Sequence, residues 1–261
     1  MSNPERNASA RYGSVSSRAG AGEIDQGLRA YMLKVYNYMA MGLGLTGIAA
    51  YAAFSAAVTT DPSLAAAEAR GGLMLTEFGV MLYTSPLKWV VMLAPLGLVF
   101  FLAARIQKMS VAAAQVTFLV YATLVGVSLS SIFLIFTGQS ITQVFFITAA
   151  SFAALSLFGY TTKRDLTGWG SFLFMGLIGL ILASVVNIFL ASSALAFAIS
   201  AIGVVVFAGL TAYDTQKIKE MYFAGDDSTS MGRKAIMGAL NLYLDFINMF
   251  IMLLQLVGDR R

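Results

Sequence analysis

Two aspartates in the last third of the chain are the residues whose type and surroundings most clearly suggest chemistry. Asp245 lies deep in an apolar run, with roughly ten residues of that run on either side, and Asp214 lies in the apolar run before it. An isolated aspartate at the centre of a membrane-spanning helix costs about 2.5 to 3.5 kcal/mol on insertion scales, so such residues usually face a partner or a cavity. Asp245 therefore needs a partner, and Asp214 is a candidate.

Counting residues indicates that the two carboxyls can meet. If the last two apolar runs form an antiparallel hairpin that turns near Ser228, Asp214 lies about 14 residues before the turn and Asp245 about 17 after it. At about 1.5 Å per residue, this is an axial offset of about 5 Å, within side-chain reach. A carboxylate pair is geometrically plausible.

Such a pair would bind protons and hard cations. Two carboxyls in one dry site cannot both ionise cheaply, so we expect the pair to share a proton and to titrate as a coupled unit. Because the chain has no histidine, a carboxyl group is the remaining candidate for sensing pH near neutrality. Ionised, the same oxygens could coordinate calcium transiently, with amide or backbone carbonyls and water completing the shell. Protons and calcium would then compete.

Other polar residues surround the two aspartates in the sequence. Asn241, Asp245, Asn248 and Gln255 recur at helical spacing on one face of the last run. This face should point inward, because lipid would leave its amides unsatisfied. It either lines a hydrated path or only hydrogen-bonds to neighbouring helices.

Arg105, at the end of the second apolar run, is the nearest counter-charge to the aspartates by predicted depth. An Arg–Asp pair could act as a latch that holds the path closed until protonation weakens it. The alternative is that Arg105 is only an anchor on the cytoplasmic side of the membrane.

Composition predicts the elements that position these residues. The 261 residues are 58% hydrophobic and 11% charged, and the apolar residues form long runs with short polar breaks. We therefore expect an all-α integral membrane protein whose partner is the lipid bilayer, with residues 25–261 forming one domain. The expected spans are about 31–57, 87–104, 111–136, 141–160, 169–190, 194–221 and 235–257.

Two segments lie outside these spans. Residues 1–24 are rich in Ser, Gly, Ala and Arg and predict a flexible N-terminal tail, not a signal peptide. The stretch 62–86 carries charges between apolar residues and predicts an extramembrane or interfacial helix.

Charge in the loops predicts the orientation. Eight basic residues fall in three alternate loops, while the loops opposite, near residues 137–140 and 191–194, carry no charge. By the positive-inside rule the N-terminus is cytoplasmic and the C-terminus external. The eight residues are Arg105, Lys108, Lys163, Arg164, Lys217, Lys219, Arg233 and Lys234.

Several function classes are disfavoured. The absence of cysteine excludes thiolate catalysis and Cys-based metal sites. The net charge of +4 has no nucleic-acid motif beside it, so we expect no nucleic-acid partner. We also expect no tightly bound cofactor.

The last two spans resemble a known family. Gly209-Leu210-Thr211-Ala212-Tyr213-Asp214-Thr215-Gln216-Lys217-Ile218-Lys219 and Leu240-Asn241-Leu242-Tyr243-Leu244-Asp245-Phe246-Ile247-Asn248-Met249-Phe250 look like the paired signature of the Bax inhibitor-1 (transmembrane BAX inhibitor motif) family. The resemblance implies six helices around a central seventh and a pH-sensitive calcium leak governed by two aspartates, which correspond to Asp214 and Asp245. It also suggests that Arg105 latches to Asp214, and that Tyr213 and Gln216, within the signature, support the site. A bacterial plasma-membrane member fits best.

Other functions stay open. Tyr213-Asp214 would suit an intramembrane aspartyl protease, although the Gly-x-Gly-Asp segment of such enzymes is absent. We therefore expect no enzyme. A regulator that acts by contact with another membrane protein, such as a membrane protease or a cell-death regulator, is the main alternative, and a proton-coupled exchanger is a third.

Overall fold

The computed structural model describes the backbone of residues 4–261 and the side chains of 26–69 and 71–261. In this part of the chain, seven helices are long and apolar enough to cross a membrane, which confirms the predicted all-α membrane fold. The largest difference in a boundary is in the last span, which begins seven residues before the predicted 235. The spans are Gln26–Ala57, Leu87–Lys108, Val111–Ile135, Gly138–Thr161, Thr167–Leu190, Ser193–Glu220 and Ser228–Val257.

The spans correspond to the following elements. They are α1 (Pro4–Ala57), α3 (Leu87–Arg105) with the 3-10 turn η3 (Ile106–Lys108), α4 (Val111–Leu129) with α5 (Ile132–Ile135), α6 (Gly138–Thr161), α7 (Thr167–Leu190), α8 (Ser193–Glu220) and α9 (Ser228–Val257). Side-chain oxygens cap the start of four of these helices by accepting a backbone N–H of the first turn, which fixes where each helix begins. The capping residues are Ser110, Thr137, Ser192 and Asp227.

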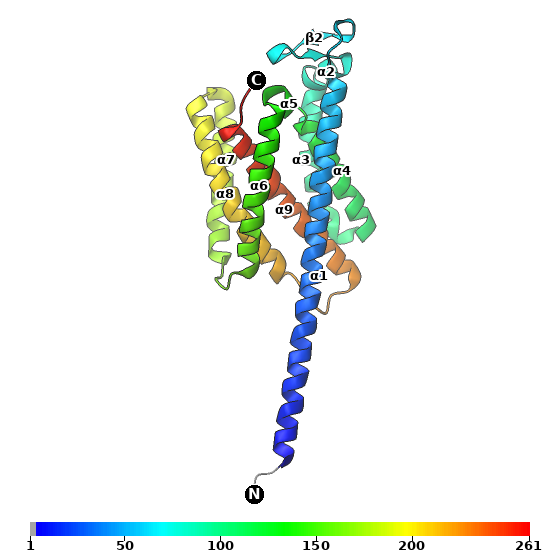
Figure 1. The fold of residues 1–261 in the computed structure, drawn as a ribbon, viewed down its shortest axis with the longest axis vertical. Helices are drawn as coiled ribbons and strands as arrows, with labels where there is room; N and C mark the ends of the chain where they lie inside the picture. The colour runs from blue at the N-terminus through cyan, green and yellow to red at the C-terminus, as the bar shows by residue number, and fades with distance from the viewer. Residues whose placement is uncertain (1–3) are drawn as a thin grey trace.

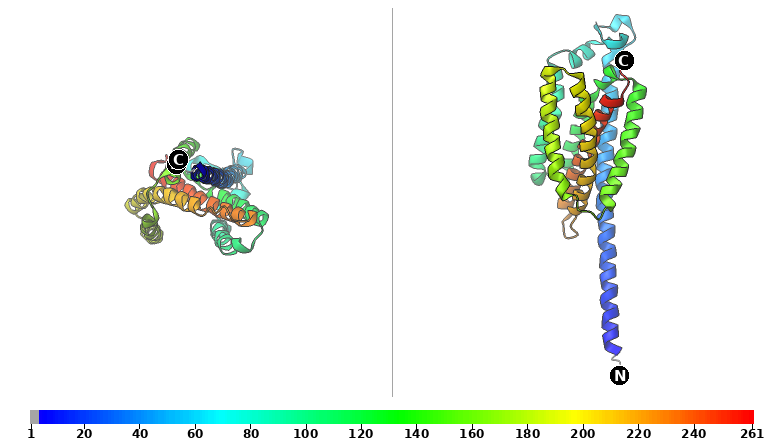
Figure 2. Two further views of the ribbon diagram at one scale, coloured as in Figure 1. Left: turned by 90° about the horizontal axis from the view of Figure 1, so that it is seen from below. Right: turned by 90° about the vertical axis from the view of Figure 1, so that its left-hand side faces the viewer.

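The last helix, α9, is the centre of the bundle. It crosses the bundle obliquely and packs against α1, α4, α6 and α8 (Figure 1). It is also the most buried of the seven spans. Seen from below, α3 and α7 lie on one side of the α8–α9 pair, and α1 and α6 lie on the other (Figure 2). The α3 helix packs mainly on α4, and α7 on α8. This arrangement agrees with the expected central seventh helix.

Two glycines let neighbouring helices approach closely. A Cβ on Gly126 of α4 would clash with the backbone carbonyl of Thr46 on α1, and a Cβ on Gly159 of α6 with that of Ala212 on α8. The second contact lies two residues from Asp214, so it sets where the carboxylate-bearing part of α8 sits against α6.

The segment after α1 differs from the interfacial helix that we expected. It contains three short antiparallel strands in the order β1-β3-β2 and only one α-helix, α2 (Glu77–Tyr83). The strands are β1 (Val58–Thr59), β2 (Ala67–Glu68) and β3 (Met74–Leu75), with 3-10 turns at Pro62–Leu64 and Arg70–Gly72. A continuous helix is broken here because Gly71 and Gly72 both have positive φ angles, of 72° and 74°.

The first helix includes most of the N-terminal segment. Residues 1–3 lie outside the described residues, and from Pro4 onward the structure continues α1 through the segment that we expected to be a flexible tail (Figure 1). Extending an existing helix needs no new nucleus, because each added residue contributes one hydrogen bond. The flexibility of this segment stays a prediction.

Candidate functional site

Asp214 of α8 and Asp245 of α9 line one partly open cavity of about 570 Å³, whose lining residues come from α7, α8 and α9. Their carboxyl groups lie within hydrogen-bonding reach of each other once one of them carries a proton. Asp245 is only 5% exposed, and its Oδ2 has no hydrogen-bond partner among the described residues. The structure thus brings together the two aspartates that the hairpin count placed at similar depth.

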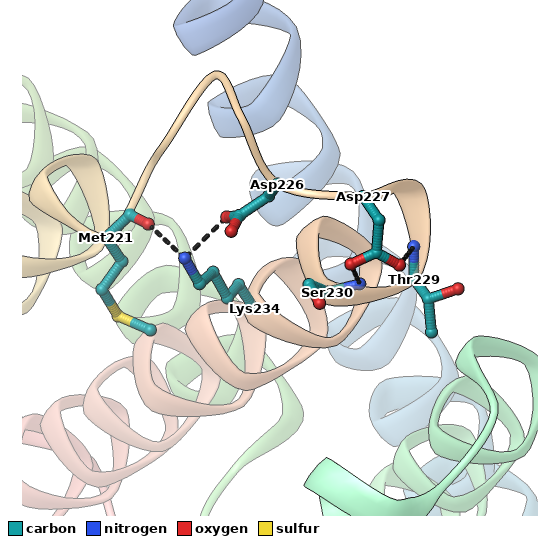
Figure 3. A network of polar contacts seen from close by, with 6 residues as sticks. All are labelled: Met221, Asp226, Asp227, Thr229, Ser230 and Lys234. Carbon is teal, nitrogen blue, oxygen red and sulfur yellow. Dashed lines mark hydrogen bonds and ion pairs between the residues drawn. The ribbon is translucent and has the colours of Figure 1, made fainter.

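The connection between α8 and α9 fixes the register of this pair. Lys234 of α9 forms an ion pair of 2.6 Å with Asp226 and donates a hydrogen bond of 3.0 Å to the carbonyl of Met221 (Figure 3). Next to it, Asp227 caps α9 by accepting the backbone N–H groups of Ser230 and Thr229. Hydrogen bonds from Ser230, together with those from Thr229, hold the pKa of the Asp227 carboxyl below its usual range. These contacts therefore fix the turn between α8 and α9 both at Met221, where α8 ends, and at Asp227, where α9 begins.

Three of the four residues of the polar face meet in the cavity. Asn241 and Asn248 line it on either side of Asp245 along α9. The fourth, Gln255, is exposed further along the helix, where its Oε1 accepts a hydrogen bond of 3.1 Å from Ser200 of α8. Gln255 therefore joins two helices, whereas the asparagines add amide oxygens to the site.

Tyr213 lies at the cavity wall, and a glycine of α7 makes room for it. A Cβ on Gly170 would come 2.5 Å from Cζ of the Tyr213 ring. Thr167 and Ser171 of α7 add hydroxyl groups to the same lining. The contribution of α7 was not predicted from the sequence, because these residues are common in spanning helices and carry no motif.

Gln216 does not line this cavity, although it was predicted to support the site. Its side chain is 5% exposed and faces the loop between α6 and α7. There Nε2 donates a hydrogen bond to the carbonyl of Arg164 and Oε1 accepts one from the N–H of Leu166, both at 2.8 Å. An amide can satisfy a backbone donor and acceptor at once, so Gln216 clamps the loop.

Arg105 is exposed at the end of α3 and lies outside the cavity lining. Within the described side chains the only ion pair joins Lys234 and Asp226, so the predicted latch to Asp214 is not formed in this conformation. The α3 helix packs mainly on α4, which leaves its C-terminal end away from α8.

Lys217 is the charged residue of the site that sequence reasoning missed. It lines the cavity together with both aspartates, and its Nζ lies 5.7 Å from the centroid of the Tyr213 ring. Residues three apart in a helix share a face, so its spacing from Asp214 was a signal. From the sequence alone, Lys217 is explained as one of the basic residues that set orientation.

The donor set resembles a transient cation site more than a permanent one. No group of three or more His, Cys, Asp or Glu side chains that could hold a metal occurs among the described residues. Two carboxylates with amide and hydroxyl oxygens nearby are all hard oxygen ligands, which calcium prefers. With only two charges, such a site would release its ion readily.

Sequence comparisons identify the protein's relatives. The family model described as "Inhibitor of apoptosis-promoting Bax1" matches residues 28–261. The chain is 51% identical over 240 residues to uncharacterized protein RP147 of Rickettsia prowazekii (strain Madrid E), covering 91% of this chain and 93% of that protein. It is 47% identical over 239 residues to inner membrane protein YbhL of Escherichia coli (strain K12), covering 90% and 94% of the two chains. It is 34% identical over 241 residues to a membrane protein of Streptococcus pyogenes, covering 90% and 95%.

Proposed function

We propose that this chain, which belongs to the family of inhibitors of apoptosis-promoting Bax1, is a pH-sensitive calcium leak channel or transporter governed by the Asp214–Asp245 pair. The similarity to an inner membrane protein of Escherichia coli supports the bacterial inner membrane as its location. With the basic loops on the cytoplasmic side, the N-terminus is inside and the C-terminus outside.

One observation carries this proposal: the buried carboxylate of Asp245 and the half-buried carboxylate of Asp214 share a cavity with polar groups in its walls. Two side chains that served only to hydrogen-bond one helix to another would satisfy each other and leave no cavity beside them. Here Asp245 keeps an oxygen without a partner, beside a cavity large enough for water. A bound ion or a proton supplies the partner that this oxygen lacks.

The cavity gives the pair a route to one side of the membrane. Its lining begins at Thr167, the first residue of α7, and at Lys217, close to the end of α8. It extends up to Leu177, about midway along α7, and to Asn248, about two thirds of the way along α9. A cation entering from the end proposed as cytoplasmic would therefore meet Asp214 first and then Asp245 deeper in the bundle.

Competition between protons and calcium gives the direction of the pH dependence. Calcium binds carboxylates only in the ionised form, so a proton on the pair displaces it. We expect calcium flux to fall as the pH is lowered through the range in which the pair takes up a proton. A weak site with two charges both admits and releases the ion, as conduction requires.

Calcium flux into liposomes containing the purified protein, measured across a pH series, tests the proposal. We expect wild-type flux to decrease on acidification, and Asp245→Asn to reduce the flux by about tenfold or more, the effect of losing one charged ligand. Asp61→Asn is the matched control, because Asp61 is exposed in the loop after β1 and should leave the flux unchanged.

Flux that does not depend on pH, or that survives in Asp245→Asn, would overturn the proposal. A simultaneous measurement of proton movement separates a leak from an exchanger. In a leak, calcium moves without a stoichiometric counter-flow of protons.

A further inference from the structure

Lys217 stands at the entrance to the cavity that holds the aspartate pair. It lies one helical turn nearer to the end of α8 than Asp214, and it is exposed. Its position in the lining means that a cation travelling toward Asp214 from this end passes the ammonium group.

Lys217 is also the only positive charge that the described lining presents to the pair. The α7 residues that line the cavity, including Thr167 and Ser171, are uncharged. The lining residues of α9 add two amides, Asn241 and Asn248, and those of α8 add the Tyr213 phenol and Lys217 itself. Among the residues that line the cavity, Lys217 is therefore the one whose positive charge can stabilise the ionised aspartates.

The Lys217 ammonium group has two partners within its reach, the Tyr213 ring and the Asp214 carboxylate. In this structure it lies over the Tyr213 ring, at a distance typical of a cation–π contact, and it forms no ion pair with the aspartates. Asp214 lies three residues away on the same helical face, within the usual range of an i,i+3 interaction. A lysine side chain has a flexible four-carbon stem, so the ammonium group can reach either placement by a change of rotamer.

We propose that the Lys217 ammonium is a tethered competitor of the transported cation, which neutralises the ionised Asp214–Asp245 pair when calcium is absent and withdraws to Tyr213 when calcium binds. This inference rests on the proposed function of the pair. It assigns to Lys217 the control of calcium affinity.

The neighbouring basic side chains are not positioned to compete with calcium at the aspartate pair. The Lys219 ammonium is engaged elsewhere, because it donates a hydrogen bond of 2.8 Å to the carbonyl of Tyr160 and lies over that ring. Arg105 is outside the cavity. Lys163 is exposed in the loop between α6 and α7 on the same side of the membrane and also lies outside the lining, which makes it the matched control.

Equilibrium binding of radioactive calcium to the purified protein at pH 8 tests the inference without relying on transport. We expect Lys217→Gln to lower the half-saturating calcium concentration by about three- to tenfold, as expected for removal of one partly screened charge from the site. Lys217→Arg and Lys163→Gln should bind calcium as the wild type does.

Flux in liposomes provides the second readout. In Lys217→Gln the pair lacks its tethered cation, so the calcium concentration that gives half-maximal flux at pH 8 should fall. Arg105→Gln should leave this concentration unchanged, whereas the latch predicted from the sequence would change it.

The possible outcomes separate the two proposals. Unchanged or weaker calcium binding in Lys217→Gln, with wild-type binding intact, overturns the role of Lys217 and leaves the proposed function standing. Calcium binding that strengthens as expected, with no flux in the wild type, supports the role of Lys217 and overturns transport. If the wild type binds no calcium, both proposals fail.

Discussion

At the scale of single residues, Asp245 is unusual because it is buried and incompletely satisfied. Buried polar groups in proteins nearly always have hydrogen-bond partners, and an oxygen without one costs free energy. Its Oδ2 has none among the described residues, while the asparagines beside it on α9 line the same cavity. A side chain kept at such a cost is better explained by a function than by stability.

This view predicts that Asp245→Asn stabilises the protein while it impairs flux. The amide keeps the shape of the side chain and needs no charge in the membrane, so we expect the free energy of unfolding to rise by about 1 to 3 kcal/mol. Thermal unfolding of the purified protein in detergent at pH 8 measures it. A loss of stability of the same size would instead mean that the carboxylate is structural.

The residues whose positions follow from the sequence differ from the others in the kind of signal they leave. Asp214 and Asp245 are found from the sequence because charge in an apolar run is costly and helical rise fixes depth. Gln216 was misplaced because the sequence does not show which face of α8 meets the loop between α6 and α7. Lys217 was overlooked because a basic residue near a membrane end already has an explanation in topology.

At the scale of helices, glycine spacing identifies only some of the close contacts. A run such as Gly42, Gly44 and Gly47 in the first span is typical of helix packing. A Cβ on Gly42 would come 2.7 Å from Cζ of Phe118, but a Cβ on Gly44 or Gly47 would meet nothing within 4 Å. The tight α6–α8 contact instead depends on Gly159, which has no glycine partner in the sequence pattern. Packing partners depend on the tertiary arrangement, so spacing alone does not reveal them.

We predict that Gly159→Ala weakens the α6–α8 contact. The new methyl group would meet the Ala212 carbonyl, so the helices must separate, at a cost of about 1 to 3 kcal/mol typical of overpacking. Gly44→Ala is the control and should be neutral or slightly stabilising, because alanine favours helix and its side chain meets open space.

Thermal unfolding of both glycine variants, with calcium binding measured in parallel, checks this prediction. Because Ala212 is two residues from Asp214, Gly159→Ala should also weaken calcium binding. Equal stability of the two variants would show that the α6–α8 contact does not set the position of α8.

At the scale of the whole molecule, hydropathy and loop charge predict most of the architecture. The seven spans follow from long apolar runs, and the polar face of α9 predicts that it points inward, because it cannot face lipid. The central place of α9 was implied by the family resemblance. The small sheet between α1 and α2 could not be predicted, because two-residue strands are too short to leave a periodic pattern. The two chain ends lie at opposite ends of the molecule, as an odd number of spans requires (Figure 1).

The central claim is that two aspartates from different helices act as one calcium site. Groups that act as a unit show non-additive losses, because removing either one already disables the site. Independent groups would instead show losses that multiply. Comparison of single and double variants therefore tests the pair itself, and not only the importance of each residue.

Calcium flux into liposomes at pH 8, compared among the wild type, Asp214→Asn, Asp245→Asn and the double variant, is the most direct measurement. We predict that each single variant loses about tenfold or more of the flux and that the double variant loses no more than the worse single one. Full flux in either single variant, or a double-variant loss equal to the product of the two single losses, would contradict the account.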